Sequence, residues 1–293
     1  MPLAWGRRLG GCLGRCALAL RSRERARGLA NLRAALPRLG EGARGRLLRG
    51  SAVLLGRNFF DMLAAGRLAE DDRWFGYAPG EEQEFGGLGE QMSGLMAGGR
   101  GLILLTGHIG SWELLGARVG RVLARIGRGP LLVVTGTVHN EPVDRILQDR
   151  RRAAGMLPVE RRAGPRPLVA HLKRGGAVAV LLDQKLSDVD PVVTFFGRPA
   201  PTPGGLVRLA VRLGIPILPV AMAWDRVTGR HVIHRLPVLN PSADRADADD
   251  DLDERVRALL QDCQGALERL IRRNPRQWVW FHDRWLSGSE ERK

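Results

Sequence analysis

Short runs of consecutive apolar residues recur along the second two thirds of the chain. They lie at Leu102–Thr106, Leu131–Thr135, 177–182 and 215–222, and hardly a polar side chain interrupts them. A strand that is apolar on both faces is typical of a parallel sheet that helices cover on both sides. The four runs therefore predict buried, parallel strands.

Amphipathic segments with helical spacing separate these runs. The helices that we expect cover 111–125, 142–154, 167–174, Gly205–Leu213 and 252–273. Alternation of strands and helices is the pattern of an α/β fold. We therefore expect an α/β fold with a mostly parallel central sheet flanked by helices, and the alternating segment 231–236 fits an outer strand.

The first part of the chain is helical in pattern and strongly basic. Residues 26–70 read as helices that are interrupted near Pro37, and residues 71–90 read as a loop or a short helix. Within 1–20, leucines and alanines recur at helical spacing between arginines, but the stretch is too polar for a membrane span, which needs about 20 apolar residues. We expect a membrane-associating helical region over 1–70 and an α/β domain over 71–293.

Charge sharpens this expectation. The net charge is +15, and residues 1–57 contain thirteen arginines against two glutamates, which points to a polyanionic partner, either a nucleic acid or an anionic membrane face. A nucleic-acid interface interleaves basic and exposed aromatic residues, whereas Trp5 is the only aromatic residue before Phe59. A membrane is therefore favoured, and a basic nucleic-acid-binding protein is the alternative. The three cysteines give no disulfide framework, which fits a reducing cytoplasm.

The segment 102–115 carries the clearest chemistry. His108 follows a buried strand, and Ser111 and Glu113 open the next helix, with Ser111 a suitable N-cap. Reactants in parallel α/β sheets gather at the carboxyl ends of the strands. A carboxylate that holds one ring N–H leaves the other nitrogen free as a base. We expect Glu113 to orient His108 as a general base; the alternative is that the pair caps the helix and complements its dipole.

Two other motif interpretations fail for this segment. Gly107 and Gly110 do not form the dinucleotide-binding G-x-G-x-x-G pattern. The stretch 109–113 is not the G-x-S-x-G nucleophile elbow either, so Ser111 is better explained as a helix cap than as a nucleophile.

Further blocks follow in order along the chain: 31–37 (NLRAALP), 108–113 (HIGSWE), 155–162 (GMLPVERR), 183–184 (DQ), 195–204 (FFGRPAPTPG), 219–220 (PV) and 272–285 (RRNPRQWVWFHDRW). With these blocks, the sequence from 31 to 285 resembles the lipid A biosynthesis (lauroyl/myristoyl-type) acyltransferases, within the lysophospholipid/glycerolipid acyltransferase superfamily. The ordered set is specific, whereas a histidine five residues before an acid is common by chance.

The resemblance implies transfer of an acyl group from a thioester, on acyl carrier protein or coenzyme A, to a hydroxyl of a membrane glycolipid such as a lipid A precursor. His108 would take the hydroxyl proton, with Glu113 as its partner. A thioester is already activated, so we expect no metal and no bound cofactor. The resemblance also implies the cytoplasmic face of the inner membrane, with peripheral attachment or a single N-terminal anchor. A non-catalytic membrane adaptor of the same fold is a further alternative.

Candidate substrate-binding residues lie near the other strand ends. Arginine matches phosphate oxygens in a bidentate manner, and Arg161 has the stronger case through its block, while Arg151 lies in a cluster at a helix end that solvent alone could explain. Asp183 and Gln184 follow the third apolar run. Asp183 would hold an arginine or a hydroxyl, or cap the next loop. The tryptophans of 278–285 suit packing or interface anchoring better than catalysis.

Overall fold

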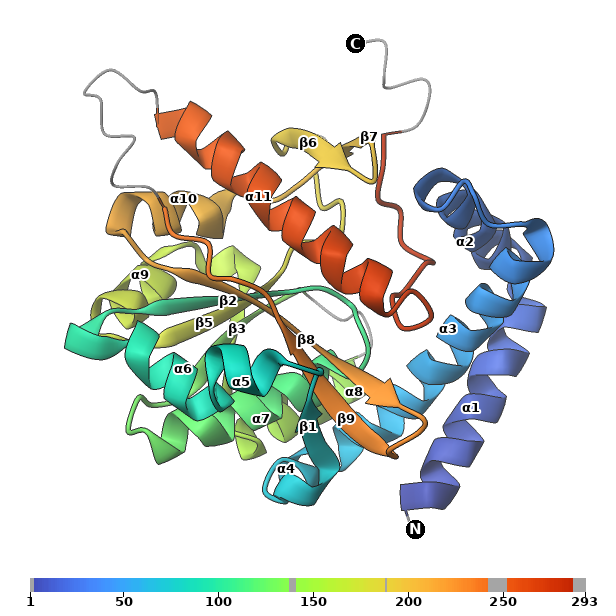
Figure 1. Ribbon diagram of the computed structural model, residues 1–293, viewed down its shortest axis with the longest axis horizontal. Helices are drawn as coiled ribbons and strands as arrows, with labels where there is room; N and C mark the ends of the chain where they lie inside the picture. The colour runs from blue at the N-terminus through green and yellow to red at the C-terminus, as the bar shows by residue number, and fades with distance from the viewer. Residues whose placement is uncertain (1–2, 137–140, 188, 242–251, 287–293) are drawn as a thin grey trace.

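The computed structural model describes residues 3–136, 141–187, 189–241 and 252–286 (Figure 1). These residues build one seven-stranded sheet with helices on both faces and a separate two-stranded hairpin. Three helices at the N-terminal side lie next to the sheet and its covering helices (Figure 1). The α/β architecture expected from the sequence is confirmed.

The sheet is mostly parallel. The strands follow the order β1 (Phe75–Tyr77), β9 (Arg230–Arg235), β8 (Ile217–Asp225), β2 (Leu102–Thr106), β5 (Ala177–Leu181), β3 (Leu131–Thr135) and β4 (Met156–Glu160). Strands β8, β2, β5, β3 and β4 pair in parallel, β9 pairs antiparallel with β8, and β1 lies parallel to β9 at the edge.

Alternate residues of the central strands face two separate hydrophobic cores. In β2, Leu102 and Leu104 belong to one core, and Ile103 and Leu105 belong to the other. Both sets are almost fully buried, because successive side chains of a strand point to opposite faces. Burial on both sides explains why the predicted strands are continuous apolar runs.

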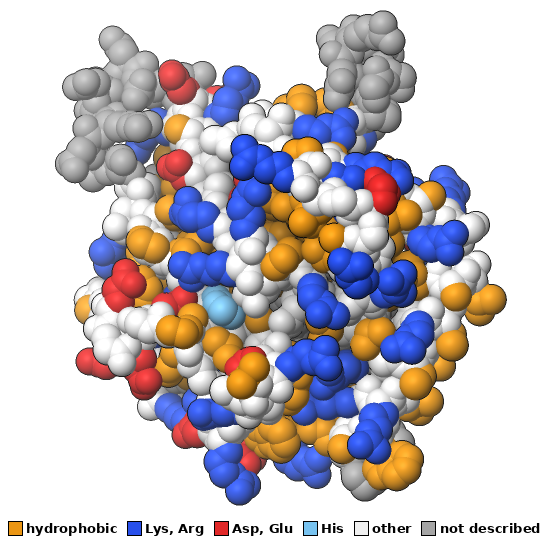
Figure 2. Space-filling model, turned by 45° about the vertical axis from the view of Figure 1, so that its right-hand side comes forward, with side chains coloured by type: hydrophobic (Ala, Val, Ile, Leu, Met, Phe, Trp, Pro, Cys, Tyr) orange, Lys and Arg blue, Asp and Glu red, His pale blue; other side chains and the backbone are white. Residues whose placement is uncertain are grey.

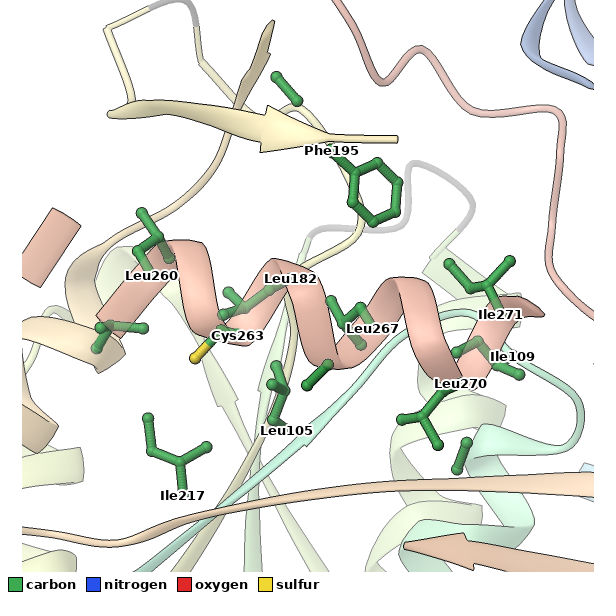
Figure 3. Packing of buried hydrophobic residues seen from close by; sticks show 14 of the residues in the cluster. Leu105, Ile109, Leu182, Phe195, Ile217, Leu260, Cys263, Leu267, Leu270 and Ile271 are labelled. Carbon is green, nitrogen blue, oxygen red and sulfur yellow. The ribbon is translucent and has the colours of Figure 1, made fainter. Parts of the chain in front are cut away.

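Helices cover each face of the sheet. One face packs against α9 (Arg166–Lys173), α10 (Gly205–Leu213) and α11 (Leu252–Arg273), and the other against α4 (Ala65–Leu68), α6 (Leu88–Leu95) and α7 (Trp112–Arg125). Figure 3 shows Cys263 and Leu267 of α11 among the buried side chains of the first face, near Leu105 and Ile217. Burial raises the pKa of the Cys263 thiol to about 12, so this cysteine acts as a small apolar residue.

The observed elements lie close to the predicted ones, with four differences. β8 begins and ends two or three residues later than predicted, and β9 is not the outermost strand because β1, inside the segment predicted as a loop or a helix, covers its edge. The segment also contains the short helices η1 (Asp72–Trp74) and α5 (Glu81–Phe85) and the start of α6. The strand β4 and the hairpin of β6 (Val192–Phe195) and β7 (Arg198–Pro201) were not predicted as strands.

The N-terminal helices form a closely packed group. α1 (Leu3–Leu20) lies on α3 (Glu41–Leu63), and α2 (Ser22–Ala35) joins them. A Cβ atom at Gly10 would lie 2.2 Å from the carbonyl oxygen of Gly56, and one at Gly14 would lie 2.1 Å from that of Ala52. The two helices therefore touch backbone to backbone. No helix in the described part of the chain is both long enough and apolar enough to cross a membrane.

A buried polar cluster attaches this group to the sheet. Arg7 of α1 donates to Asp61 of α3 over 2.5 Å, and its guanidinium lies 2.9 Å from Nε2 of His231 in β9. The guanidinium also lies over the ring of Trp224, at 4.4 Å. Arginine can only donate, so Nε2 of His231 accepts and Nδ1 carries the proton. Burial, reinforced by the charges of Arg7 and Arg57, lowers the pKa of His231 to about 3.

Candidate active site

His108 and Asp183 meet at the carboxyl edge of the sheet. Thr106 of β2 pairs with Leu181 of β5, and each strand is followed two residues later by one member of this pair. Nδ1 of His108 lies 2.9 Å from Oδ1 of Asp183, and the backbone N–H of His108 donates to Oδ2 over 2.6 Å. The indole N–H of Trp278 donates to the same Oδ2 over 2.8 Å. Asp183 therefore fixes both the ring and the backbone of His108.

This geometry corrects the expected pairing of His108 with Glu113. The carboxylate of Glu113 accepts two hydrogen bonds from Arg151, at 3.0 and 2.5 Å, and forms no hydrogen bond with His108 in the described part of the chain. The physical reason is the turn of α7: Glu113 lies in its first turn and points toward α8 (Glu141–Ala153), which carries Arg151. The expected role of Asp183, holding an arginine or a hydroxyl or capping a loop, is replaced by a hydrogen bond to the imidazole.

The electrostatics determine which ring nitrogen carries the proton. Asp183 is fully buried, which by itself would raise the pKa of its carboxyl group. The charge of His108 when protonated, with the hydrogen bonds from His108 and Trp278, outweighs burial and lowers that pKa. An ionised carboxylate only accepts hydrogen bonds, so Nδ1 of His108 carries the proton. Nε2 is left as the acceptor.

The loop that carries His108 depends on two glycines. A Cβ atom at Gly107 would lie 2.8 Å from Oδ2 of Asp183. Gly110 has a φ of 55°, and a Cβ atom there would lie 1.9 Å from the carbonyl oxygen of Met222. Either side chain would move the loop, so the two glycines allow the close approach that brings His108 to Asp183.

A residue of α3 also holds this loop. The amide of Asn58 donates to the carbonyl of Gly110 over 2.6 Å, and its oxygen accepts from the hydroxyl of Ser111 over 2.9 Å. Ser111 does stand at the N-cap position of α7, but its side chain makes no capping hydrogen bond, because it is used by Asn58. The predicted position of Ser111 at the N-cap is correct, but the expected hydrogen bond from its side chain to the start of the helix is not formed.

Two aromatic groups flank His108. The rings of His282 and Trp112 lie 4.7 and 5.0 Å from it, both in edge-on arrangements. Burial, with the nearby charge of His108, lowers the pKa of His282 to about 4, and the amide of Gln184 lies 3.0 Å from its Nδ1. His282 is thus neutral at pH 7, and it encloses one side of the catalytic imidazole candidate without adding charge.

A cavity of about 780 Å³ opens beside His108, within the range of small-molecule sites. It exists because the sheet parts at its carboxyl edge. β3 pairs with β5 only from Leu131 to Val133, after which β3 continues beside β4 and β5 continues beside β2. Val134 and Val180 line the gap, and its walls are mainly aliphatic.

Polar groups stand at the mouth of this cavity. Arg161, Gln184 and the paired Glu113 and Arg151 all line it, together with His108. Burial would lower the pKa of Arg151, but the hydrogen bonds and charge of Glu113 raise it overall. Five of the six residues selected from the sequence therefore line one cavity, and Asp183 lies directly behind His108. In the described part of the chain, no group of three or more His, Cys, Asp or Glu residues is arranged to hold a metal ion.

The last block of the sequence is largely structural. Trp280 and Trp285 are buried, and the buried Arg284 donates to the oxygens of Pro201, Thr202 and Gln264. The expected packing role of these tryptophans is confirmed. Trp278 is the exception, because it also donates to Asp183. Sequence reasoning missed this role, and it missed Asn58 altogether.

Comparison with known proteins places the sequence among bacterial acyltransferases. The family model described as bacterial lipid A biosynthesis acyltransferase matches residues 1–287. The chain is 24% identical over 215 residues to a phosphatidylinositol mannoside acyltransferase of Mycobacterium tuberculosis (strain CDC 1551 / Oshkosh), which covers 72% of this chain and 62% of that relative. It is 25% identical over 202 residues to a lipid A biosynthesis acyltransferase of Haemophilus influenzae, covering 69% and 58%.

The chain thus spans about 60% of the length of these two relatives. The family model, in contrast, matches nearly the whole sequence. On that match, the chain belongs to the bacterial lipid A biosynthesis acyltransferase family.

Proposed function

We propose that the chain is an O-acyltransferase that moves a fatty acyl group from an acyl thioester to a hydroxyl of a membrane glycolipid. One observation carries the proposal: His108 stands at the mouth of a largely aliphatic cavity, with Nδ1 held by a buried, ionised Asp183. This arrangement leaves Nε2 as a base directed by its ring partner. A cavity with aliphatic walls and a polar mouth suits an acyl chain whose reactive end is polar.

In the proposed reaction, Nε2 of His108 takes the proton of the acceptor hydroxyl as its oxygen attacks the thioester carbonyl carbon. The resulting tetrahedral intermediate collapses, the C–S bond breaks, and the imidazolium returns its proton to the thiolate. Asp183 remains ionised and stabilises the imidazolium. A positioned base of this kind contributes about 10²–10⁴-fold.

The other cavity residues receive roles in binding. Arg161 forms no ion pair with the described residues and lines the mouth, so we assign it to the phosphate of the donor or the acceptor. Glu113 is held by Arg151 away from the imidazole, and we assign this pair and Gln184 to the polar part of the acceptor. The thioester is a co-substrate, and this scheme uses no metal and no bound cofactor.

The names of the relatives suggest which acceptors to test. One is named for phosphatidylinositol mannosides and the other for lipid A. We propose a glycolipid of one of these two classes, with acyl carrier protein or coenzyme A as donor. The basic N-terminal helices support a place at the cytoplasmic face of the inner membrane, where the donor is soluble and the acceptor is in the bilayer.

A transfer assay tests the proposal. Radiolabelled acyl thioester is incubated with each acceptor and with the wild type, His108→Ala or His108→Asn, and the lipids are separated by chromatography. We expect the wild type to label one acceptor and both variants to lose at least about 10²-fold in rate. Equal rates in the wild type and the variants would overturn the mechanism. Absence of transfer to any lipid hydroxyl by a folded wild type would favour the non-catalytic adaptor.

A further inference from the structure

A second groove, of about 910 Å³, lies beside α3. It shares no lining residue with the cavity beside His108, which we call the reaction cavity. It has no aspartate or glutamate among its lining residues, and its arginines form no ion pair with any described residue. The arginines of this groove, which we call the arginine groove, are Arg15, Arg46, Arg49, Arg57, Arg226 and Arg276.

The fold assembles the arginine groove from four separate segments. Three of its arginines lie on one face of α3, Arg15 comes from α1, Arg226 follows β8, and Arg276 follows α11. A solvated face of a single helix would not draw on four segments. In Figure 2, Lys and Arg side chains gather where α1 to α3 turn toward the viewer, and acidic side chains are few there.

The floor of the arginine groove is apolar. Leu47, Val53, Leu54 and Trp224 lie among its arginines, and the guanidinium of Arg57 lies over the Trp224 ring at 5.1 Å. Burial, followed by the charge of Arg7, lowers the pKa of Arg57. Several cations around a partly desolvated floor repel one another unless an anion lies between them. The planar guanidinium group matches the oxygens of a phosphate in particular.

A second observation concerns α1, which contributes Arg15 to the groove. Its glycine face packs on α3, so its apolar stripe points outward: Trp5, Leu9, Leu13 and Leu20 are exposed at 62%, 47%, 55% and 84%. These residues follow helical spacing, with Arg8 and Arg15 beside them. An exposed apolar stripe that is bordered by arginines is typical of a helix that lies in a membrane interface.

We propose that the arginine groove binds the phosphate group of an anionic phospholipid while the apolar stripe of α1 lies in the adjoining bilayer surface. The protein then has a lipid site that is separate from the reaction cavity. The stripe favours a lipid over a soluble phosphate compound, which would need no apolar surface beside its site. It also favours a lipid over an acidic protein, because a charged protein surface does not match exposed leucines and an indole.

Vesicle flotation with the full chain tests the proposal. The protein is mixed with phosphatidylcholine vesicles that either contain or lack phosphatidylglycerol, and the bound fraction is measured. The test variant combines Arg46→Gln, Arg49→Gln and Arg276→Gln, three exposed residues. Each basic residue near an anionic leaflet contributes roughly fivefold to binding, so we expect a loss of about 100-fold on the anionic vesicles.

A matched control removes the same charge elsewhere. It combines Arg174→Gln, Arg212→Gln and Arg257→Gln, which are exposed at or near the helices that cover the sheet, outside the arginine groove. We expect the control to bind anionic vesicles within about threefold of the wild type, because the effect of a charge falls off within a Debye length of the membrane. Thermal melting confirms that both variants are folded.

Each alternative outcome overturns the proposal. Equal losses in the two variants would mean that net charge alone acts. Displacement of the wild type from vesicles by soluble glycerol phosphate at matched phosphate concentration would assign the groove to a free phosphate compound. A test variant that floats normally but no longer binds acidic acyl carrier protein would assign it to that protein. His108→Ala should float like the wild type, so the result does not depend on the proposed reaction.

Discussion

The groups around His108 and the arginine groove differ in whether their charged side chains are paired. Around His108, the buried carboxylate of Asp183 receives three hydrogen bonds, and Glu113 is paired with Arg151. In the arginine groove, six guanidinium groups surround a cavity that has no carboxylate in its lining. Yet the two sites share α3, whose Asn58 holds the His108 loop and whose Arg57 lines the groove.

Paired and unpaired charges have different physical consequences. Buried charges that are fully paired fix a geometry, since breaking one partner leaves the other uncompensated. Unpaired charges of one sign do not fix the positions of their side chains, but they raise the local concentration of a counter-ion. The paired arrangement suits a side chain that must be held in one orientation. The unpaired arginines suit the binding of an anionic ligand.

The largest effect should come from breaking the pairing around His108. We expect Asp183→Asn to lower kcat by about 10³–10⁴-fold, because an amide no longer fixes the tautomer of His108. Glu113→Gln should lower the rate less, because Glu113 binds Arg151 and not His108. The measurement is kcat and KM for both variants. A mild effect of Asp183→Asn beside a large loss of kcat in Glu113→Gln would restore the sequence-based pairing.

The next effect concerns the buried cluster that joins the two regions. The pKa of His231 is about 3 in the folded protein and about 6.5 in the unfolded chain. The unfolded chain therefore binds the proton first, and stability falls as the pH drops from about 6.5 toward 3, by at most about 1.4 kcal/mol per pH unit.

Urea unfolding between pH 7 and pH 4.5 measures this dependence. The buried Asp61, whose pKa burial raises, titrates with the opposite sign, so the comparison is between the wild type and His231→Gln. Glutamine can accept from Arg7 but does not titrate. We expect a shallower loss of stability in the variant, and parallel curves would contradict the assignment.

A smaller effect should follow from separating α1 from α3. A Cβ atom at Gly56 would lie 1.9 Å from the carbonyl oxygen of Gly10, so we expect Gly56→Ala to cost about 1–3 kcal/mol. Gly45→Ala is the control on the same helix: its Cβ meets no atom closer than 3.6 Å, and it should stabilise by up to about 1 kcal/mol. Chemical denaturation compares the two, and equal signs would contradict the close helix contact.

The smallest effect tests the link between the two regions. Asn58→Ala removes both hydrogen bonds to the His108 loop, and we expect kcat to fall by about tenfold, as for one or two ordinary hydrogen bonds. Ser111→Ala, which removes only one of them, should have a smaller effect. Steady-state kinetics with detergent-dispersed acceptor measures both. If the two variants act equally, the bond to the Gly110 carbonyl contributes nothing.

The sheet could be predicted from the sequence where strands are buried on both faces, because such strands are continuous apolar runs, as in β2 and β5. The sequence did not predict β1 or β4 as strands, because these are edge strands with mixed polarity. Pattern alone cannot separate such segments from loops. The hairpin β6–β7 is short and contains two prolines, which likewise hides it.

For the site, proximity along the chain was misleading. Glu113 is five residues from His108, whereas Asp183 is 75 residues away and yet contacts it. The contact follows from the neighbouring positions of β2 and β5, a sheet order that no local pattern encodes. The parting of β3 from β5 that opens the cavity is equally a property of the assembled sheet.

The hydrogen bond from Trp278 to Asp183 has a consequence for synthesis. Trp278 follows every strand of the sheet in the chain, and the next residue, Val279, donates to the carbonyl of His108. When His108 and Asp183 have left the ribosome during translation, Trp278 has not yet been added, and the hydrogen bonds from Trp278 and Val279 are still missing. The hydrogen-bonded set of His108, Asp183 and Trp278 is therefore completed only after all strands of the sheet have been synthesised.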